Sequence, residues 1–334
     1  MKLNLEQIKS ITQGAVRISE ESSGFSFHRF NEEEENFYIN TTHKIKILSS
    51  AGIQMVFKTD ADSLAFKASV SGGSSRKYFS FDVYADDELC DEFKNFEHEN
   101  MTLPYTTIEC ELGNFSWHAP LKEGEKTVRI VFPFSVNPII SDFTLENATY
   151  IEPIKRSKTM LMYGDSITHG YDCLNSSKAY AVQLSHMLDA EAFNKAIGGE
   201  VFQPELSKIK NDISPDYITV AYGTNDWSQH SLERLEESCR GFYRNLKNNY
   251  PDAKIFAITP IWRGDYDIER QFPFSGVYET ISKVCGEIGG ITVIDGFNLV
   301  PHEKELFADL RLHPSNEGFD HYAKNLYDEI RKYI

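Results

Sequence analysis

Four short segments combine residue types that could catalyse acyl transfer. They are residues 164–170 (GDSITHG), 196–200 (AIGGE), 223–226 (GTND) and 312–314 (LHP). Acyl transfer needs a nucleophilic oxygen, a base that takes its proton, and N–H donors that face the oxyanion as it forms. A serine, glycines, an asparagine and a histidine supply these parts in chain order. The sequence therefore predicts a serine hydrolase.

Ser166 is the candidate nucleophile, because a strand-to-helix turn would project its hydroxyl and its own N–H into one cleft. Taken alone, GDS could equally be a helix cap. Thr168 stands where the GxSxG elbow of α/β-hydrolases has glycine, which disfavours that family. His313 is the candidate base, since unperturbed imidazole titrates near about 6.5 and can accept the serine proton at neutral pH. His169 and His321 are its rivals.

The second half of the chain has the pattern that would position these residues. From residue 158, short apolar runs alternate with segments of helical period, which is typical of βαβ units around a parallel sheet. Catalytic groups gather beyond the carboxyl ends of the strands in such sheets, and three of the four segments directly follow predicted strands. We therefore expect their loops to open on one edge. The predicted strands span residues 159–163, 191–194, 217–222, 254–259 and 291–294.

The first half has a different period. Apolar residues alternate with polar ones at residues 64–70, 79–83 and 128–132, as strands with one face in a core require. Helical signals are scarce, so we expect an antiparallel β-sandwich over residues 1–152 and an α/β domain over residues 158–334. The acidic run of residues 32–35 is expected to be a solvated loop.

The segments GDSITHG, NKAIGGE, YGTNDW and LHPSNEG resemble the four blocks of the SGNH, or GDSL, hydrolase superfamily, whose members are esterases and related acyl hydrolases. Their order and spacing agree over residues 158–334. The resemblance implies a three-layer α/β/α flavodoxin-like domain with a parallel five-stranded sheet. It also implies that Ser166 is the nucleophile, that His313 is the base, and that Ser166, Gly199 and Asn225 form the oxyanion hole.

The chemistry of the two further donors agrees with these roles. Gly199 has no Cβ to block the approach of its N–H to a substrate oxygen, and Asn225 offers an uncharged amide donor. In isolation, each could instead be an ordinary turn residue.

One position departs from the pattern of the superfamily. Its triad aspartate usually lies three residues before the histidine, where this chain has Leu310, whereas Asp309 lies four residues before. Asp309 completes the triad if the loop absorbs the extra residue. The alternative is a backbone carbonyl that orients His313, which would leave a Ser/His dyad.

The composition disfavours several classes of function. Lys and Arg number 34 against 50 Asp and Glu, so the formal charge of −16 argues against nucleic acid as a partner. No window approaches about eighteen consecutive apolar residues, and the first residues lack the apolar run of a secretory signal. We therefore expect a cytoplasmic protein without a membrane span. The expected chemistry needs neither a metal nor a cofactor.

The first half also bears on the substrate, because its alternating runs and its place before a GDS domain resemble the jelly-roll modules of two-domain SGNH carbohydrate esterases. We expect hydrolysis of small acyl esters, mainly acetyl esters, on a sugar or oligosaccharide. Trp227 and Trp262 follow strands and could stack on sugar rings, although core packing is the commoner role. Two alternatives stay open: a lipid or thioester acyl hydrolase, and an inactive carbohydrate-binding protein.

Overall fold

Two antiparallel sheets form the first part of the molecule in the computed structural model, which describes residues 1–334 throughout. The strands are β1 (Thr12–Gln13), β2 (Arg17–Glu21), β3 (Gly24–His28), β4 (Gln54–Thr59), β5 (Ser63–Gly72), β6 (Ser80–Ala85), β7 (Glu88–Lys94), β8 (Gly113–Pro120), β9 (Lys126–Val131), β10 (Val136–Glu146) and β11 (Ile151–Pro153). One sheet has the order β2-β3-β10-β5-β8, and the other has the order β1-β4-β9-β6-β7 with β11 paired to β4.

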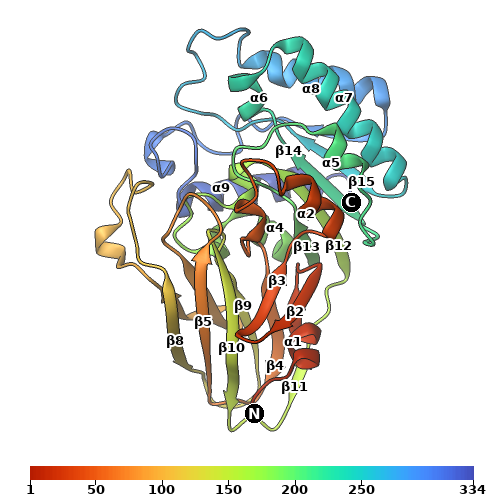
Figure 1. The fold of residues 1–334 in the computed structure, drawn as a ribbon. Coiled ribbons are helices and arrows are strands. Elements are labelled where there is room, and N and C mark those ends of the chain that lie inside the picture. Colours follow the sequence, from red (N-terminus) through yellow and green to blue (C-terminus); the bar gives the residue numbers. More distant parts are fainter.

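The core of this sandwich follows from the alternation in the sequence. Along β5, the side chains of Leu64, Phe66 and Ala68 are buried, while Lys67 between them is exposed. Because successive side chains of a strand point to opposite faces, this pattern places one face of each sheet inside. The inner faces of the two sheets enclose one apolar cluster. The strands of this sandwich lie in the lower half of the molecule in Figure 1. The predicted antiparallel β-sandwich is confirmed.

The second part is built on a parallel sheet of five strands with the order β13-β12-β14-β15-β16. Its main elements are β12 (Lys158–Gly164), α3 (Ser166–His169), α4 (Tyr180–Met187), β13 (Ala190–Asn194), α5 (Pro204–Lys208), β14 (Tyr217–Ala221), α6 (Thr224–Gln229), α7 (Leu232–Asn249), β15 (Lys254–Ile258), α8 (Ser275–Ile288), β16 (Ile291–Ile294) and α9 (Asn316–Ile330). The five predicted strands are all present, with bounds that differ by one residue or none.

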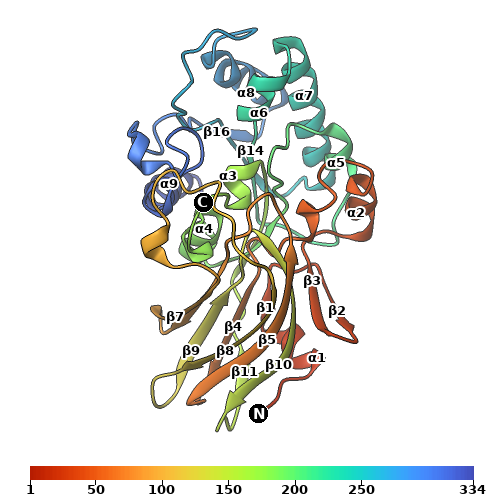
Figure 2. The ribbon, with the colours of Figure 1, turned by 60° about the vertical axis from the view of Figure 1, so that its left-hand side comes forward.

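Helices cover both faces of this sheet (Figures 1 and 2). Met160 and Met162 of β12 pack into an apolar cluster with side chains of α4 and α9. Leu161 and Tyr163, which point to the opposite face, pack with side chains of α5, α7 and α8. The three-layer α/β/α architecture is therefore confirmed.

The first part also contains two helices, α1 (Leu5–Ile11) and α2 (Glu32–Tyr38), which the sequence did not reveal. The acidic run at residues 32–35 is not a solvated loop but the first turn of α2, capped by Asn31. Negative side chains stabilise the first turn of a helix because they face its positive end. One of them, Glu34, is only 1% exposed and contacts Lys195 at 2.6 Å.

Buried contacts join the two parts. Arg29 is fully buried and donates hydrogen bonds to the carbonyls of Ser49 on its own side and of Asn194 and Ala196 on the other. Apolar clusters also cross the join, since Phe30 and Tyr38 pack with side chains of α5 and α7. The two parts thus share buried polar and apolar contacts, and the division into residues 1–152 and 158–334 stays a prediction.

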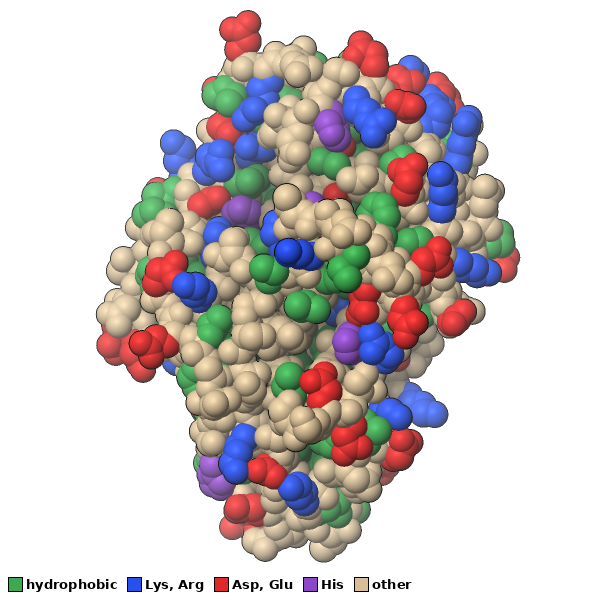
Figure 3. Space-filling model, viewed as in Figure 1, with side chains coloured by type: hydrophobic (Ala, Val, Ile, Leu, Met, Phe, Trp, Pro, Cys, Tyr) green, Lys and Arg blue, Asp and Glu red, His purple; other side chains and the backbone are tan.

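The surface carries many charged side chains. On the face shown in Figure 3, acidic and basic side chains are interspersed over both parts of the molecule. None of the helices is both long enough and apolar enough to cross a bilayer. The predictions about nucleic acid and about cellular location are not tested by these features.

Candidate active site

The loop after β12 presents Ser166 at the start of a short helix. The Asp165 carboxylate caps this helix by accepting the Ile167 N–H at 2.9 Å. A Cβ at position 164 would lie 2.1 Å from the Thr168 hydroxyl oxygen, so only glycine allows α3 to begin this close to the strand. The helix therefore starts directly at Ser166, whose side chain is available for chemistry rather than for capping.

Ser166 and His313 meet across the carboxyl edge of the sheet. Ser166 Oγ lies 2.9 Å from His313 Nε2, which is hydrogen-bonding distance for the transfer of a proton. Both residues are nearly buried: Ser166 is 5% exposed, and the His313 side chain is 13% exposed. His313 precedes α9, which begins after the N-cap residue Ser315.

Asp309 lies one residue farther from His313 than the superfamily pattern has it, and Leu310 accommodates this extra residue. Leu310 has a φ of 57°, in the left-handed region that L-residues seldom occupy. Asp309 Oδ1 accepts the backbone N–H groups of Arg311 and Leu312, and also that of His313, at 2.6–3.1 Å. The tightened turn brings Asp309 Oδ2 to 3.0 Å from His313 Nδ1. A carboxylate, rather than a backbone carbonyl, therefore reaches the imidazole.

A second carboxylate reaches the same nitrogen. Asp172 Oδ2 also lies 3.0 Å from His313 Nδ1, and the Asp172 side chain is completely buried. Asp172 was not predicted, because only the carboxylates a few residues before His313 were candidates for the triad. The available signal was an aspartate six residues after Ser166 and two residues after Gly170, the glycine that ends α3.

Together, Asp172, Asp309 and His313 each place one atom of a metal-ligating type within 4.8 Å of one another. Arg76 already contacts both oxygens of Asp172, at 2.5 and 2.9 Å, and Tyr78 donates to one of them. This donor set fits two carboxylates that share one imidazole N–H, and a cation would have to displace Arg76. We therefore assign the group to orientation of the imidazole.

The two carboxylates alter the titration of His313. Burial alone would lower the pKa of His313, but the hydrogen bonds and charges of Asp172 and Asp309 outweigh it and raise the pKa to about 9. Burial would likewise raise the pKa of Asp172, but its hydrogen bonds with His313 and Arg76 lower it well below the usual range. Asp172 is therefore a carboxylate at neutral pH, and the imidazolium is the favoured form of His313.

The AIGGE loop, which carries Gly199, contacts the loop of Ser166. The Ile197 N–H donates to the Gly164 carbonyl at 3.0 Å, and the Gly198 N–H donates to His169 Nδ1 at 3.2 Å. Gly199 itself is exposed and has a φ of 87°, which only glycine adopts without strain. His169, the rival candidate base, thus supports this loop and does not face Ser166.

Asn225 lies in the first turn of α6, opposite the AIGGE loop. Its amide nitrogen donates one hydrogen bond to the Glu200 carbonyl at 2.9 Å. Because an amide nitrogen carries two hydrogens, the second remains free for a substrate oxygen. The loop of Gly199 thus contacts the GDS loop through Gly164 and contacts Asn225 through Glu200. The roles of Ser166, Gly199 and Asn225 in the oxyanion hole stay a prediction.

Neither of the two tryptophan rings is exposed for contact with a substrate. Trp227 is 1% exposed, its indole N–H donates to the Phe272 carbonyl at 2.9 Å, and Arg270 lies over its ring. Trp262 is 7% exposed, and its ring stacks on His302. Both rings pack in the apolar clusters of the α/β part, which is the commoner role named above, and neighbouring side chains cover them against stacking on sugar rings.

The match to a known family agrees with this fold and arrangement. Residues 162–321 match the model of the GDSL-like Lipase/Acylhydrolase family. The α/β part and this match define an ester-hydrolysing enzyme. Residues 162–321 belong to the GDSL-like lipase and acylhydrolase family, which confirms the predicted superfamily. A search of the curated proteins finds no match.

Solved structures share the whole two-part fold. A salicylyl acyltransferase, SsfX3, from a tetracycline biosynthetic pathway is 18% identical, with a TM-score of 0.81 over 96% of this chain and 94% of its own. An acetyl xylan esterase, Est2A, from the rumen bacterium Butyrivibrio proteoclasticus is 14% identical, with a TM-score of 0.64 over 99% and 98%. A family two carbohydrate esterase from Clostridium thermocellum is 16% identical, with a TM-score of 0.63 over 85% and 93%.

Proposed function

We propose that the protein is a serine esterase that removes small acyl groups, chiefly acetyl, from a carbohydrate. The observation that carries the proposal is the 2.9 Å contact between Ser166 Oγ and His313 Nε2, with carboxylates behind Nδ1 of the same ring. A hydroxyl becomes an effective nucleophile when an adjacent base takes its proton as it attacks, and this contact supplies that base.

In the proposed mechanism, His313 takes the proton of Ser166 as Oγ attacks the ester carbonyl. The backbone N–H groups of Ser166 and Gly199, together with the Asn225 amide, donate to the oxyanion. His313 then protonates the leaving alcohol, and the acyl group stays on Ser166. Water, deprotonated by His313, attacks the acyl-enzyme. The bond between the acyl carbon and Ser166 Oγ breaks, His313 returns its proton to Oγ, and the acid is released.

The side chains around the oxyanion glycine favour a polar alcohol. Lys46 Nζ donates to the Gly198 carbonyl, and His43 lies beside Glu200 at 3.9 Å. A Cβ on Gly199 would meet only these two side chains, Lys46 at 3.5 Å and His43 at 3.8 Å. Hydroxyl groups of a sugar can hydrogen-bond to such neighbours, whereas a lipid chain would leave their donors without partners. The esterases of similar fold make acetyl the first acyl group to test.

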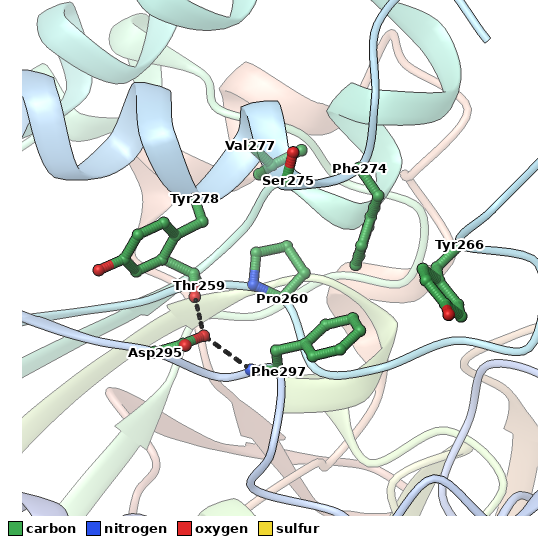
Figure 4. A pocket seen from close by; sticks show the side chains of 9 residues that line it. All are labelled: Thr259, Pro260, Tyr266, Phe274, Ser275, Val277, Tyr278, Asp295 and Phe297. Atoms are coloured by element: carbon green, nitrogen blue, oxygen red, sulfur yellow. Dashed lines mark hydrogen bonds between the residues drawn. The ribbon is translucent and has the colours of Figure 1, made fainter. Parts of the chain in front are cut away.

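The alternative function is a hydrolase of lipid or thioester substrates with longer acyl chains. One feature at the carboxyl edge of the parallel sheet favours it. An apolar pocket of about 260 Å³ lies beyond β15 and β16, where the rings of Tyr266, Phe274 and Phe297 face one another (Figure 4). None of the residues that line this pocket belongs to the candidate site. An apolar pocket of this kind suits the chain of a lipid or thioester substrate, so chain-length preference separates the two functions.

We expect the enzyme to release acetate from acetylated xylo-oligosaccharides and to hydrolyse 4-nitrophenyl acetate faster than the octanoate. The measurement is kcat/KM for the acetate, butyrate and octanoate esters alongside enzymatic detection of acetate. A preference for octanoate would favour the lipid or thioester hydrolase instead. Adding an alcohol acceptor to the same assay separates hydrolysis from acyl transfer, the activity named for the salicylyl acyltransferase.

Replacing Asn225 by alanine should lower kcat by about 10²-fold, because one oxyanion donor is lost. The KM should change little, since the amide is expected to bind the developing oxyanion more tightly than the ester carbonyl. Gln229→Ala, an exposed amide at the end of the same helix, is the matched control and should retain full kcat. Equal activities for the two variants would remove Asn225 from the oxyanion hole.

A further inference from the structure

His313 is held by two carboxylates, and the second one depends on the first part of the molecule. A neutral imidazole that accepts at Nε2 carries its single proton on Nδ1. Nδ1 is hydrogen-bonded to Asp309 Oδ2 at 3.0 Å, and Asp172 Oδ2 lies at the same distance from Nδ1. The two carboxylates therefore fix the same ring orientation and the same tautomer, the one that leaves Nε2 free to accept the proton of Ser166.

The surroundings of the two carboxylates differ. Asp309 is 15% exposed, and its other oxygen is occupied by backbone N–H groups of its own loop. Asp172 has no exposure, and all its other side-chain partners come from the first part of the molecule. Arg76 Nε donates to Asp172 Oδ1 at 2.5 Å and its terminal nitrogen to Oδ2 at 2.9 Å. Tyr78 O–H donates to Oδ1 at 2.7 Å.

A third residue of the first part holds the backbone at the same point. Tyr105 O–H donates to the Asp172 carbonyl at 2.9 Å, and Asp172 has a φ of 70°. L-residues seldom adopt this left-handed conformation, and the Tyr105 hydrogen bond helps to hold the Asp172 backbone in it. Residues of the first part of the molecule thus hold both the backbone and the side chain of Asp172 across the interface between the two parts.

We propose that Asp172 is a positioning residue for His313, and that Arg76 and Tyr78 hold it in place, so that the β-sandwich forms part of the catalytic apparatus. This inference rests on the proposed function, in which His313 acts as the base.

The charges explain why Asp172 needs Arg76. A buried carboxylate without a counter-ion carries a large desolvation cost, and two carboxylates facing one N–H would repel each other. The two-point contact with the Arg76 guanidinium offsets the charge of Asp172 and fixes the plane of its carboxylate. Asp172 can then remain ionised beside Asp309 and stabilise the imidazolium that forms when Ser166 loses its proton.

The proposal has a consequence for the pH profile. His313 faces Asp172 and Asp309 at Nδ1 and Ser166 at Nε2, with Asp165 and the Tyr171 ring nearby and Arg76 behind Asp172. Because the two carboxylates raise the pKa of His313 to about 9, kcat/KM should rise with pH until the imidazolium has lost its proton near that pH. Removal of one negative charge should lower this pKa and move the acid limb to lower pH.

The main test uses Asp172→Asn, Asp309→Asn and the double variant in the full-length protein. We expect each single variant to lose about tenfold in kcat and to shift the acid limb of kcat/KM down by about one pH unit. The double variant should lose about 10⁴-fold, more than the product of the two single losses, because no carboxylate then holds the imidazole. Thermal unfolding is measured for each variant.

A second test keeps the buried charge pair intact and alters only one contact from across the join. Tyr78→Phe removes the hydroxyl that donates to Asp172, and we expect a loss of about tenfold in kcat with KM unchanged. The matched control is Tyr84→Phe, which removes a 2.8 Å hydrogen bond to Ser177 across the same join but away from His313. This control should keep the kcat and the pH profile of the unmodified enzyme.

Any of three outcomes would overturn the proposal. The first is an acid limb of kcat/KM that lies at the same pH in Asp172→Asn as in the unmodified enzyme. The others are a double variant with the same kcat as Asp309→Asn alone, and equal kcat for the two tyrosine variants. The tyrosine comparison decides the matter if Asp172→Asn does not fold. Ser166→Ala separates this proposal from the proposed function. If Ser166→Ala is inactive and any of these three outcomes is observed, the proposed function stands. Only the role of Asp172 and of the β-sandwich is then wrong.

Discussion

Replacing Ser166 by alanine should lower kcat/KM for 4-nitrophenyl acetate by at least about 10⁴-fold, because the acyl-enzyme can no longer form. Removal of the hydroxyl leaves the N–H donors of Gly199 and Asn225 in place, so a residual rate above that of water should remain. The measurement is steady-state hydrolysis corrected for the spontaneous reaction. Mass spectrometry after treatment with a fluorophosphonate should show an adduct on Ser166 in the unmodified protein and none in the variant.

A matched control for this change is Ser185→Ala. Ser185 is a buried serine on α4 whose hydroxyl donates to the Val182 carbonyl of the same helix. Its removal tests for nonspecific effects of taking a hydroxyl out of the α/β part, and full activity is expected. Activity of Ser166→Ala within tenfold of the unmodified enzyme would exclude Ser166 as the nucleophile. No labelling and no hydrolysis by the unmodified protein would favour an inactive carbohydrate-binding protein.

Local patterns in the sequence predicted the scaffold of this site well. The strands of the α/β part are short, continuous apolar runs with clear breaks, and burial on both faces of the sheet requires that pattern. The place of Ser166 at the carboxyl edge of the sheet could be predicted as well, because loops that follow parallel strands meet there. His313 lies just before α9 and not directly after a strand, so its place beside Ser166 was expected from the resemblance to the superfamily. Asp309 was within reach of the same reasoning, although the left-handed Leu310 that absorbs the extra residue was not.

The features that escaped prediction depend on contacts between distant parts of the chain. Asp172 and Arg76 are far apart in sequence, and neither lies in a motif that would point to the other. Glu34 was predicted as exposed because acidic runs usually are, and its burial follows only from the place of Lys195 on the opposite part. The covering of Trp227 by Arg270 is a packing result of the same kind. At these positions, contacts between residues distant in sequence determine the burial and the partners of the side chain, and the local pattern does not predict them.

Replacing Lys195 by methionine should lower the free energy of unfolding by about 3–5 kcal/mol, because it leaves the buried Glu34 carboxylate without its cation. Lys195 Nζ contacts Glu34 Oε2 at 2.6 Å and also donates to the Arg29 carbonyl at 2.8 Å and to Asn211 Oδ1 at 2.9 Å. Neither side chain of the ion pair is more than 1% exposed, so water cannot replace the lost partner. Urea unfolding followed by circular dichroism measures the change.

The matched control is Lys324→Met, the same substitution in the exposed pair of Lys324 and Asp328 on α9. Their side chains are 72% and 36% exposed, so the loss should be below about 1 kcal/mol. Combining Lys195→Met with Glu34→Leu should recover most of the stability, because no charge is then left buried without a partner. If Lys195→Met were as stable as the control, the buried pair would not contribute to holding the sandwich against the α/β part. A recovery in the double variant would show that the cost arises from the unpaired charge, and not from lost packing around α2.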